Sequence, residues 1–428
     1  MTTEERKRII ALINREVVPA VGCTEPAAVS LAVAKATELI GSRPEALKLR
    51  LSGNIIKNAM GVGIPGTGMI GLPIAVALGA LIGKSEYQLE VLREVTDESV
   101  KEGREYIDEN RISIGLEPDA PSNLWIDVEA EGKNSKSRVI IGYGHTNFIY
   151  EEKDGEILLD RRHEDAGSSS STESDPELTL RMVWDFAMTA PVEEIEFILE
   201  AKKLNKAAAE YALAGNYGHS LGVTLRHHGN RWFGDTPLSH AIGMTSAACD
   251  ARMGGAPIPV MSNSGSGNQG ITATMPVVAF AEDVNASEEQ TIRALVLSNL
   301  TSIYIKQSLG RLSALCGCVV ASTGASSALV YLMGGDYPQV CAAVKNMVAN
   351  LTGMICDGAK PACSLKISSG VSTAMMSAMM AMNERCVTSA EGIVCEDVDR
   401  TVRNLTAIGR DAMKVTDEFV LDLMTNKC

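Results

Sequence analysis

The chain has 428 residues, of which 45% are hydrophobic and 21% are charged, a composition typical of a folded protein with more than one domain. Its net charge of −14 and its lack of Lys/Arg runs argue against binding to nucleic acid or to an anionic membrane. Aromatic residues make up only 4%, whereas Gly and Met are frequent, which favours closely packed helices over an aromatic-rich sandwich.

The N-terminal part, residues 1–165, is predicted to form a small α/β domain. Helical periodicity and then an alternating apolar pattern predict two helices and a strand, at 4–16, 26–41 and 47–51. A further helix and three strand patterns follow, at 86–107, 122–130, 136–142 and 145–150. The N-terminus contains only a five-residue apolar stretch, too short for a signal peptide, so we expect a cytoplasmic protein.

A linker is predicted at residues 166–176, which are rich in serine and acidic side chains and contain no large apolar residue. Beyond it, residues 177–428 show almost no strand pattern. Helices are expected at 191–214, 237–252, 287–308, 338–352, 366–382 and 396–425. The predicted fold class is therefore α+β, with the α/β domain followed by a large all-helical domain.

Two uncharged stretches, at 59–83 and 312–335, each exceed the roughly 20 residues that a bilayer span requires. The first contains seven Gly and two Pro, and the second contains Ser, Thr and two Cys. Each is therefore predicted to be a glycine-containing loop with a buried helix, and no membrane partner is expected.

Cys316, Cys356 and Cys363 stand in small-residue contexts, LCGC and GMICDGAKPAC. Three thiolates can hold an iron–sulfur cluster and leave one iron open for a substrate, which points to catalysis rather than electron transfer. Two alternatives remain open from the residues alone. The cysteines could be small buried apolar residues, or they could bind zinc with a fourth donor, although no paired CxxC motif and no nearby His supports this. Cys318 could exchange roles with Cys316.

Cys23 lies just ahead of a predicted helix start, at Thr24 or Glu25 followed by Pro26. Backbone N–H groups and the positive end of the helix dipole stabilise a thiolate, so we expect a lowered pKa and a role in proton transfer. The alternative is a cysteine chosen for its small size.

Two glycine-rich segments are candidate anion sites. SGNIIKNAMGVGIPGTG, at 52–68, follows a strand and could form a backbone anion cradle or only a tight turn, and it matches neither nucleotide-binding fingerprint. SNSGSGNQG, at 262–270, precedes a helix expected near Ile271 and offers N–H groups with Asn263 and Ser264 to a carboxylate, unless it is a flexible loop.

Together these segments resemble the iron–sulfur L-cysteine desulfidase family, which is related to the iron–sulfur L-serine dehydratases and includes the conserved UPF0597-type proteins. The resemblance covers nearly the whole chain and rests on GCTEP at 22–26, SGNIIKN at 52–58, SNSGSGNQG at 262–270, CGC at 316–318 and CDGAKPAC at 356–363. It implies the α/β domain and the helical cluster domain described above, with the active site between them.

The resemblance also implies that Cys316, Cys356 and Cys363 ligate a [4Fe–4S] cluster and that Cys23 is the catalytic acid/base. Some related dehydratases place a terminal cysteine on the open iron, so Cys428 is a further candidate. We assign the binding of a small amino-acid substrate to Glu25, Asn54, Asn263 and Ser264.

The expected activity is that of a carbon–sulfur lyase, which converts L-cysteine to hydrogen sulfide, ammonia and pyruvate. Serine dehydratases carry a serine-rich motif with a histidine where this chain has GCTEP, which argues against serine as the preferred substrate. L-Serine dehydration at the same site and a non-catalytic cluster-bearing sensor are the alternatives. A pyridoxal-phosphate lyase would need a Schiff-base lysine, for which Lys57 is the candidate. The substrate and further copies of this chain are the expected partners.

Overall fold

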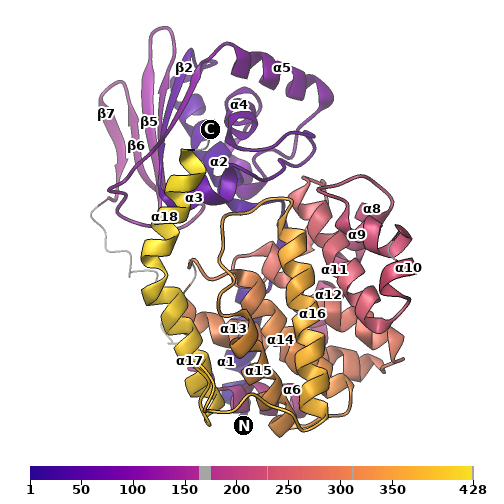
Figure 1. Ribbon diagram of the computed structural model, residues 1–428. Helices are drawn as coiled ribbons and strands as arrows, with labels where there is room; N and C mark the ends of the chain where they lie inside the picture. Colours follow the sequence, from indigo (N-terminus) through magenta and orange to yellow (C-terminus); the bar gives the residue numbers. More distant parts are fainter. Residues whose placement is uncertain (163–174, 229, 311–312, 427–428) are drawn as a thin grey trace.

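The computed structural model describes residues 1–162, 175–228, 230–310 and 313–426 (Figure 1). The strands are β1 (Pro19–Val21), β2 (Ala46–Leu51), β3 (Ile112–Leu116), β4 (Trp125–Glu131), β5 (Lys136–Gly142), β6 (Phe148–Lys153), β7 (Glu156–Asp160) and β8 (Pro259–Met261). The α-helices of the first part are α1 (Thr3–Glu16), α2 (Thr24–Ile40), α3 (Gly53–Ala59), α4 (Leu72–Leu81) and α5 (Asp97–Asp108).

The remaining α-helices are α6 (Leu180–Thr189), α7 (Val192–Ile195), α8 (Leu199–Leu213), α9 (Leu221–Val223), α10 (Asn230–Phe233), α11 (Pro237–Met253), α12 (Gly267–Asp283), α13 (Glu288–Leu309), α14 (Gly317–Leu332), α15 (Tyr337–Leu351), α16 (Cys363–Met382), α17 (Val398–Ala407) and α18 (Lys414–Thr425). Short 3₁₀ or π segments are η1 (Ser85–Glu90), η2 (Glu196–Ile198), η3 (Thr224–His228) and η4 (Ile408–Ala412). The fold is thus mixed α+β, with a small sheet region and a large helical part.

The main sheet has the strand order β3-β2-β4-β5-β6-β7, with β2 and β3 parallel and the other neighbours antiparallel. Strand β2 alternates as predicted, with Leu47, Leu49 and Leu51 buried and the residues between them exposed. Helix α2 covers the buried face and packs on β4 and β5. It is tied to the sheet by a hydrogen bond that the Ser137 hydroxyl donates to the Ala36 carbonyl (2.7 Å).

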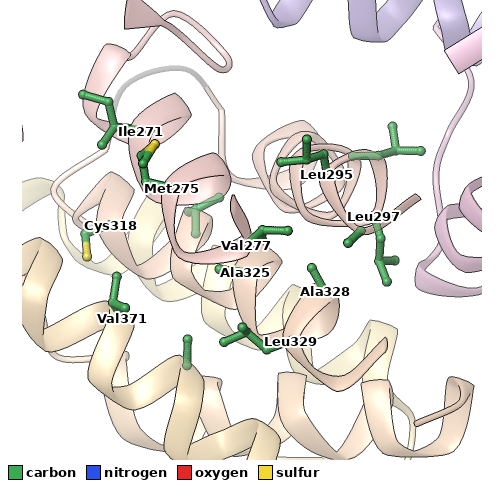
Figure 2. Packing of buried hydrophobic residues seen from close by; sticks show 14 of the residues in the cluster. Ile271, Met275, Val277, Leu295, Leu297, Cys318, Ala325, Ala328, Leu329 and Val371 are labelled. Carbon is green, nitrogen blue, oxygen red and sulfur yellow. The ribbon is translucent and has the colours of Figure 1, made fainter. Parts of the chain in front are cut away.

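The helical part is built around α14, which packs against α12, α13, α15 and α16. Figure 2 shows this core, in which Ala325, Ala328 and Leu329 of α14 lie between the side chains of its neighbours. Glycines bring the helices close together: a Cβ at Gly324 would stand 2.3 Å from the Ser298 carbonyl oxygen of α13. This is the close helix packing that the small-residue composition predicted.

The structure corrects three expectations about secondary structure. The single helix near 86–107 is wrong, because Thr96 accepts a hydrogen bond from the Ser99 N–H (3.2 Å) and caps a new helix, α5, after η1. The second part is not entirely helical, since β8 pairs antiparallel with β1, a partner far away in sequence. Strands β3 and β7 were not predicted. Both are short and mostly exposed; β3 alternates at Ile112, Ile114 and Leu116, whereas β7 does not alternate.

Each terminal helix packs on the part of the molecule that is distant from it in sequence (Figure 1). Helix α1 is N-terminal, yet its buried side chains Ile9, Leu12 and Ile13 belong to the helical core. Helix α18 is C-terminal, yet its Leu421 packs against the core of the sheet region. The predicted linker lies largely outside the described residues, and the limits of the two domains stay predictions. Among the described helices, none combines the length and the apolar run that crossing a bilayer demands.

Candidate active site: a thiol-lined cavity

A cavity of about 110 Å³ brings together Cys23 and the three candidate cluster ligands. It is lined by Cys23, Glu25, Asn58, Arg252, Gly265, Ser266, Asn268, Gln269, Cys316, Gly317, Cys318, Cys356, Gly358, Ala359, Cys363, Lys366 and Ile367. Segments from residue 23 to residue 367 thus meet at one place. Three of the five segments that carry the resemblance contribute thiols to it.

Helices α2, α12, α14 and α16 all begin at this cavity. Cys23, Ser266 and Cys316 are the N-cap residues of α2, α12 and α14, and Cys363 is the first residue of α16. The N-terminus of a helix carries a partial positive charge and unpaired N–H groups, so each of these helices favours negative charge in the cavity. The arrangement therefore suits thiolates and an anionic ligand.

A short β ribbon places Cys23 beside the start of α12. Strands β1 and β8 pair from Pro19–Met261 to Val21–Pro259, and the Ser262 N–H donates to the Val18 carbonyl (2.8 Å). The chain leaves β1 into α2 and leaves β8 into the loop ahead of α12. Two helix starts that lie far apart in sequence are therefore neighbours in space.

A second antiparallel contact sets Cys316 beside Cys356. Leu315 and Ile355 form an isolated bridge, in which the Cys316 N–H donates to the Met354 carbonyl at 3.0 Å. The thiol of Cys363 lies in the turn that follows and donates to the Gly358 carbonyl (3.7 Å). The thiol of Cys318, the alternative ligand, is also buried and donates to the Lys366 carbonyl (3.2 Å).

Gly358 packs this turn against α3, the helix of the SGNIIKN segment. Its φ is +89°, and a Cβ there would stand 2.0 Å from the Lys57 carbonyl oxygen, so no other residue fits without displacing the backbone. The side chain of Lys57 is 3% exposed and forms an ion pair with Asp417 of α18. The SGNIIKN segment thus supports the loop that carries Cys356.

The segment at 61–68 packs as a turn on the end of α11. The N–H groups of Gly63 and Gly66 donate to the Met253 and Gly255 carbonyls (3.0 and 3.2 Å), and those of Ile64 and Thr67 also donate to protein carbonyls. These four donors are therefore not available to an anion. The contact with α11 joins the sheet region to the helix that carries Arg252.

Burial dominates the protonation of the cavity thiols. It raises the pKa of Cys23 to about 12, and the nearby Arg252 guanidinium lowers this pKa only in part. The expected low pKa of Cys23 is therefore wrong for the protein alone, because loss of solvent outweighs the helix dipole. Burial and the neighbouring Cys356 likewise raise the pKa of Cys316 to about 12, and burial raises the pKa of Cys363.

Two cations, Arg252 and Lys366, line the cavity. Lys366 opposes the rise that burial causes in the pKa of Cys316, and Lys360 and Lys366 oppose the rise in the pKa of Cys363. Lys366 also forms an ion pair with Asp357 and donates to the Ile355 carbonyl (2.8 Å). Burial raises the pKa of Asp357, but hydrogen bonds from Lys360 and Lys366 outweigh burial and hold this pKa at about 2. Arg252 acts on Cys23 instead and has no carboxylate partner among the described residues.

The predicted substrate-binding residues are distributed unevenly. Glu25 lines the cavity, whereas Asn54 lines a separate and larger one near α18. Asn263 is fully buried beside the cavity and donates to the Asn299 carbonyl at 3.1 Å, and Ser264 donates to the Asn263 side chain at 2.9 Å. These two residues hold the loop, and their role with substrate stays a prediction.

Sequence reasoning missed Arg252, Asn268 and Gln269, which also line the cavity. The last two follow Ser264 within the SNSGSGNQG segment, so the segment itself was identified correctly while its cavity-lining residues were not. Arg252 lies in a helical stretch, SAACDARMGG, whose nearly complete burial was the missing signal. An arginine amid small apolar residues is unusual in a buried helix unless something pairs with it.

Cys316, Cys356 and Cys363 are donors of the kind that an iron–sulfur cluster uses. Their free thiols line one cavity together with those of Cys23 and Cys318; Cys316 and Cys363 lie at helix N-termini, and Cys356 lies in a loop. Among the described residues, no group of three or more Cys, His, Asp or Glu side chains is spaced to hold a single metal ion. A cluster spreads its thiolates around several irons rather than one. Cys428 lies outside the described residues.

Comparison with known proteins gives consistent matches over the whole chain. Residues 86–422 match the family model described as serine dehydratase alpha chain. A UPF0597 protein of Bacteroides fragilis is 62% identical over 428 residues, covering 100% of both chains. UPF0597 proteins of Phocaeicola vulgatus (62% over 425 residues, 99% of this chain and 98% of the relative) and Oleidesulfovibrio alaskensis (45% over 428 residues, 100% of both) are also similar.

Proposed function

Because the chain belongs to the UPF0597 family and to the wider serine dehydratase alpha-chain family, we propose that it is an iron–sulfur-dependent L-cysteine desulfidase. The reaction would be β-elimination of L-cysteine to hydrogen sulfide, ammonia and pyruvate. The observation that carries this proposal is the meeting of Cys23 with Cys316, Cys356 and Cys363 in one buried cavity at helix N-termini.

Cys316, Cys356 and Cys363 would hold a [4Fe–4S] cluster. Bound through three thiolates, such a cluster supplies a Lewis-acidic iron with a free coordination position. The chain's own contribution is to stabilise the ligands as thiolates, through the dipoles of α14 and α16 and the charge of Lys366.

Cys23 is our candidate for the acid/base residue. It lines the same cavity as the ligand cysteines, and its thiol is buried beside Arg252. Without substrate, the Cys23 thiol holds its proton, the form that can protonate the leaving sulfur. To accept the α-proton it must first be a thiolate, so a bound substrate would have to stabilise the thiolate form of Cys23. Elimination breaks the Cα–H and Cβ–S bonds, and the aminoacrylate formed tautomerises and hydrolyses to pyruvate and ammonia.

L-Serine dehydration at the same site is the second candidate, because the matching family model is that of serine dehydratases. Both substrates present a carboxylate, an α-proton and a β leaving group to the same residues. They differ in the affinity of sulfur and oxygen for iron and in leaving ability.

The test is anaerobic reconstitution of the full chain with iron and sulfide, followed by steady-state assays of L-cysteine and L-serine. We expect sulfide, ammonia and pyruvate in equal amounts from L-cysteine, with a higher kcat/KM than for L-serine. A higher kcat/KM for L-serine would reassign the protein as a dehydratase. Cluster-loaded protein that released ammonia from no amino acid would indicate a sensor, and a borohydride-sensitive cofactor at Lys57 would indicate a pyridoxal-phosphate lyase.

A further inference from the structure

Arg252 is a buried cation held in a fixed position at the wall of the cavity. It is 6% exposed, its Nε donates to the Gly22 carbonyl (3.1 Å), and its Nη1 donates to the Asn268 side-chain oxygen (3.0 Å). Gly267 makes this position possible, because a Cβ there would stand 2.2 Å from the Arg252 Nε. The first turn of α12 therefore packs directly on the guanidinium.

No carboxylate among the described residues lies within ion-pairing distance of Arg252. Its side chain also forms a hydrogen bond with the thiol of Cys23, which burial keeps protonated. A buried charge without a counter-charge is costly, and proteins normally pair it. Three neutral partners, the Gly22 carbonyl, the Asn268 side-chain oxygen and the protonated Cys23 thiol, hold the guanidinium in place without compensating its charge, so this wall of the cavity suits an anionic ligand.

The candidate cluster ligands have cations of their own. Lys366 acts on Cys316 and, together with Lys360, on Cys363, whereas Arg252 acts on Cys23 and on Cys249. Arg252 therefore faces the side of the cavity where we place proton transfer. An α-amino acid has its carboxylate on the carbon that loses the proton, so a carboxylate at Arg252 would put that carbon near Cys23.

We propose that Arg252, together with the N-terminus of α12, binds the α-carboxylate of the amino-acid substrate. This rests on the proposed function and names the group that the enzyme recognises. The planar guanidinium offers parallel N–H donors that match a carboxylate, and the N–H groups at the start of α12 lie beside it. Amino acids with a free carboxylate are then substrates, and esters, amides or amines that lack it are not.

The first measurement is equilibrium binding of L-alanine, which lacks a leaving group, compared with L-alaninamide by calorimetry. We expect the reconstituted wild-type protein to bind L-alanine at least ~10-fold more tightly than the amide, as charge-assisted hydrogen bonds imply. Arg252→Met should remove this preference, and Arg252→Lys should restore part of it. Because no turnover is needed, binding that depends on Arg252 would stand even if no amino acid proved to be a substrate.

The second measurement is the ratio of kcat/KM for L-cysteine to that for its methyl ester. We expect the ratio to fall about 10- to 100-fold in Arg252→Met at unchanged iron content. Gly267→Ala keeps the charge but displaces the guanidinium, so it should lower the ratio as well if Arg252→Met fails to fold. Arg93→Met removes an exposed cation that lines a neighbouring cavity and serves as the matched control.

An unchanged preference for the free carboxylate in both Arg252→Met and Gly267→Ala would overturn the proposal. So would loss of iron from Arg252→Met with the preference intact, since Arg252 would then serve the cluster. An equal loss of preference in Arg93→Met would show that only the overall positive charge matters.

Discussion

Two cavities of this protein each contain a buried cation, and they treat it differently. In the larger one, of about 510 Å³ between α3 and α18, Lys57 forms an ion pair with Asp417. In the thiol-lined cavity, Arg252 is equally buried but has only neutral acceptors among the described residues. The first cation is balanced by a carboxylate, and the second has no carboxylate partner in the part of the chain that the structure describes.

Whether the buried cation has a carboxylate partner distinguishes a structural contact from a binding site more clearly than the volume of the cavity does. The larger cavity is where α18 reaches from the helical part to the sheet region, so its ion pair fastens one part to the other (Figure 1). The smaller cavity collects helix N-termini, thiols and an uncompensated arginine. We therefore expect mutations around the first to change stability and mutations around the second to change binding and turnover.

The largest effect is expected from the ligand cysteines. Cys316→Ala should abolish incorporation of the iron–sulfur cluster, because two thiolates remain where three are needed. Iron and acid-labile sulfide measured after anaerobic reconstitution test this, with Cys341→Ala on α15 as the control that keeps both. Normal iron content in Cys316→Ala would remove Cys316 from the ligand set, and Cys318 would be the next residue to replace.

Removing the thiol of Cys23 should leave the cluster in place and slow the reaction. We expect Cys23→Ala to lower kcat by roughly 10²- to 10⁴-fold, the usual contribution of a positioned acid/base group. Its iron content should equal that of the wild type, and Cys386→Ala, a half-buried thiol outside the cavity, should retain activity. Loss of iron from Cys23→Ala would identify Cys23 as a ligand instead.

Substitution by methionine should change the stability of the protein at one buried cation and hardly at the other. Lys57→Met leaves Asp417 unpaired and should lower the free energy of unfolding by about 2 kcal/mol, since one partner of a buried pair is lost. Arg252→Met removes an unbalanced charge and should change it by less than about 1 kcal/mol in the apoprotein. Urea denaturation of both variants measures these changes in unfolding free energy. The prediction fails if Arg252→Met is the more destabilised of the two.

A smaller, pH-dependent effect is expected at Asp250, which neighbours Arg252 in sequence. Burial raises the pKa of Asp250 to about 6, while its Oδ2 accepts from the Gly222 N–H (2.8 Å). A carboxyl whose pKa is higher in the folded state than in the unfolded state contributes stability below pH 4. That contribution is lost as the pH rises through 6.

Asp250→Asn cannot ionise, so it avoids this loss. Between pH 5 and 7.5 the variant should gain about 1 kcal/mol of unfolding free energy relative to the wild type. Denaturation of the two apoproteins at both pH values measures this gain. A difference between them that does not change with pH would show that Asp250 is already ionised at pH 5.

Much of the secondary structure could be predicted because it depends on local patterns. The alternation at Leu47, Leu49 and Leu51 gave β2, and the periodicity over 26–41 gave α2. The pairing of β1 with β8 could not be predicted, because strands of three residues show no alternation and their partners lie more than 200 residues apart. The function of the glycines at 61–68 was also hidden, because it consists of contacts with the end of α11.

The sequence by itself determined the mixed α+β composition, the cysteines that could bind a cluster and the segments from which the site is built. Only the tertiary structure decided that these cysteines and Cys23 line one cavity, that Cys23 holds its proton, and that Arg252 stands unbalanced beside it. The physical reason is that residue types and short-range periodicity are properties of neighbouring positions along the chain. Burial and charge balance instead depend on groups that meet only after folding.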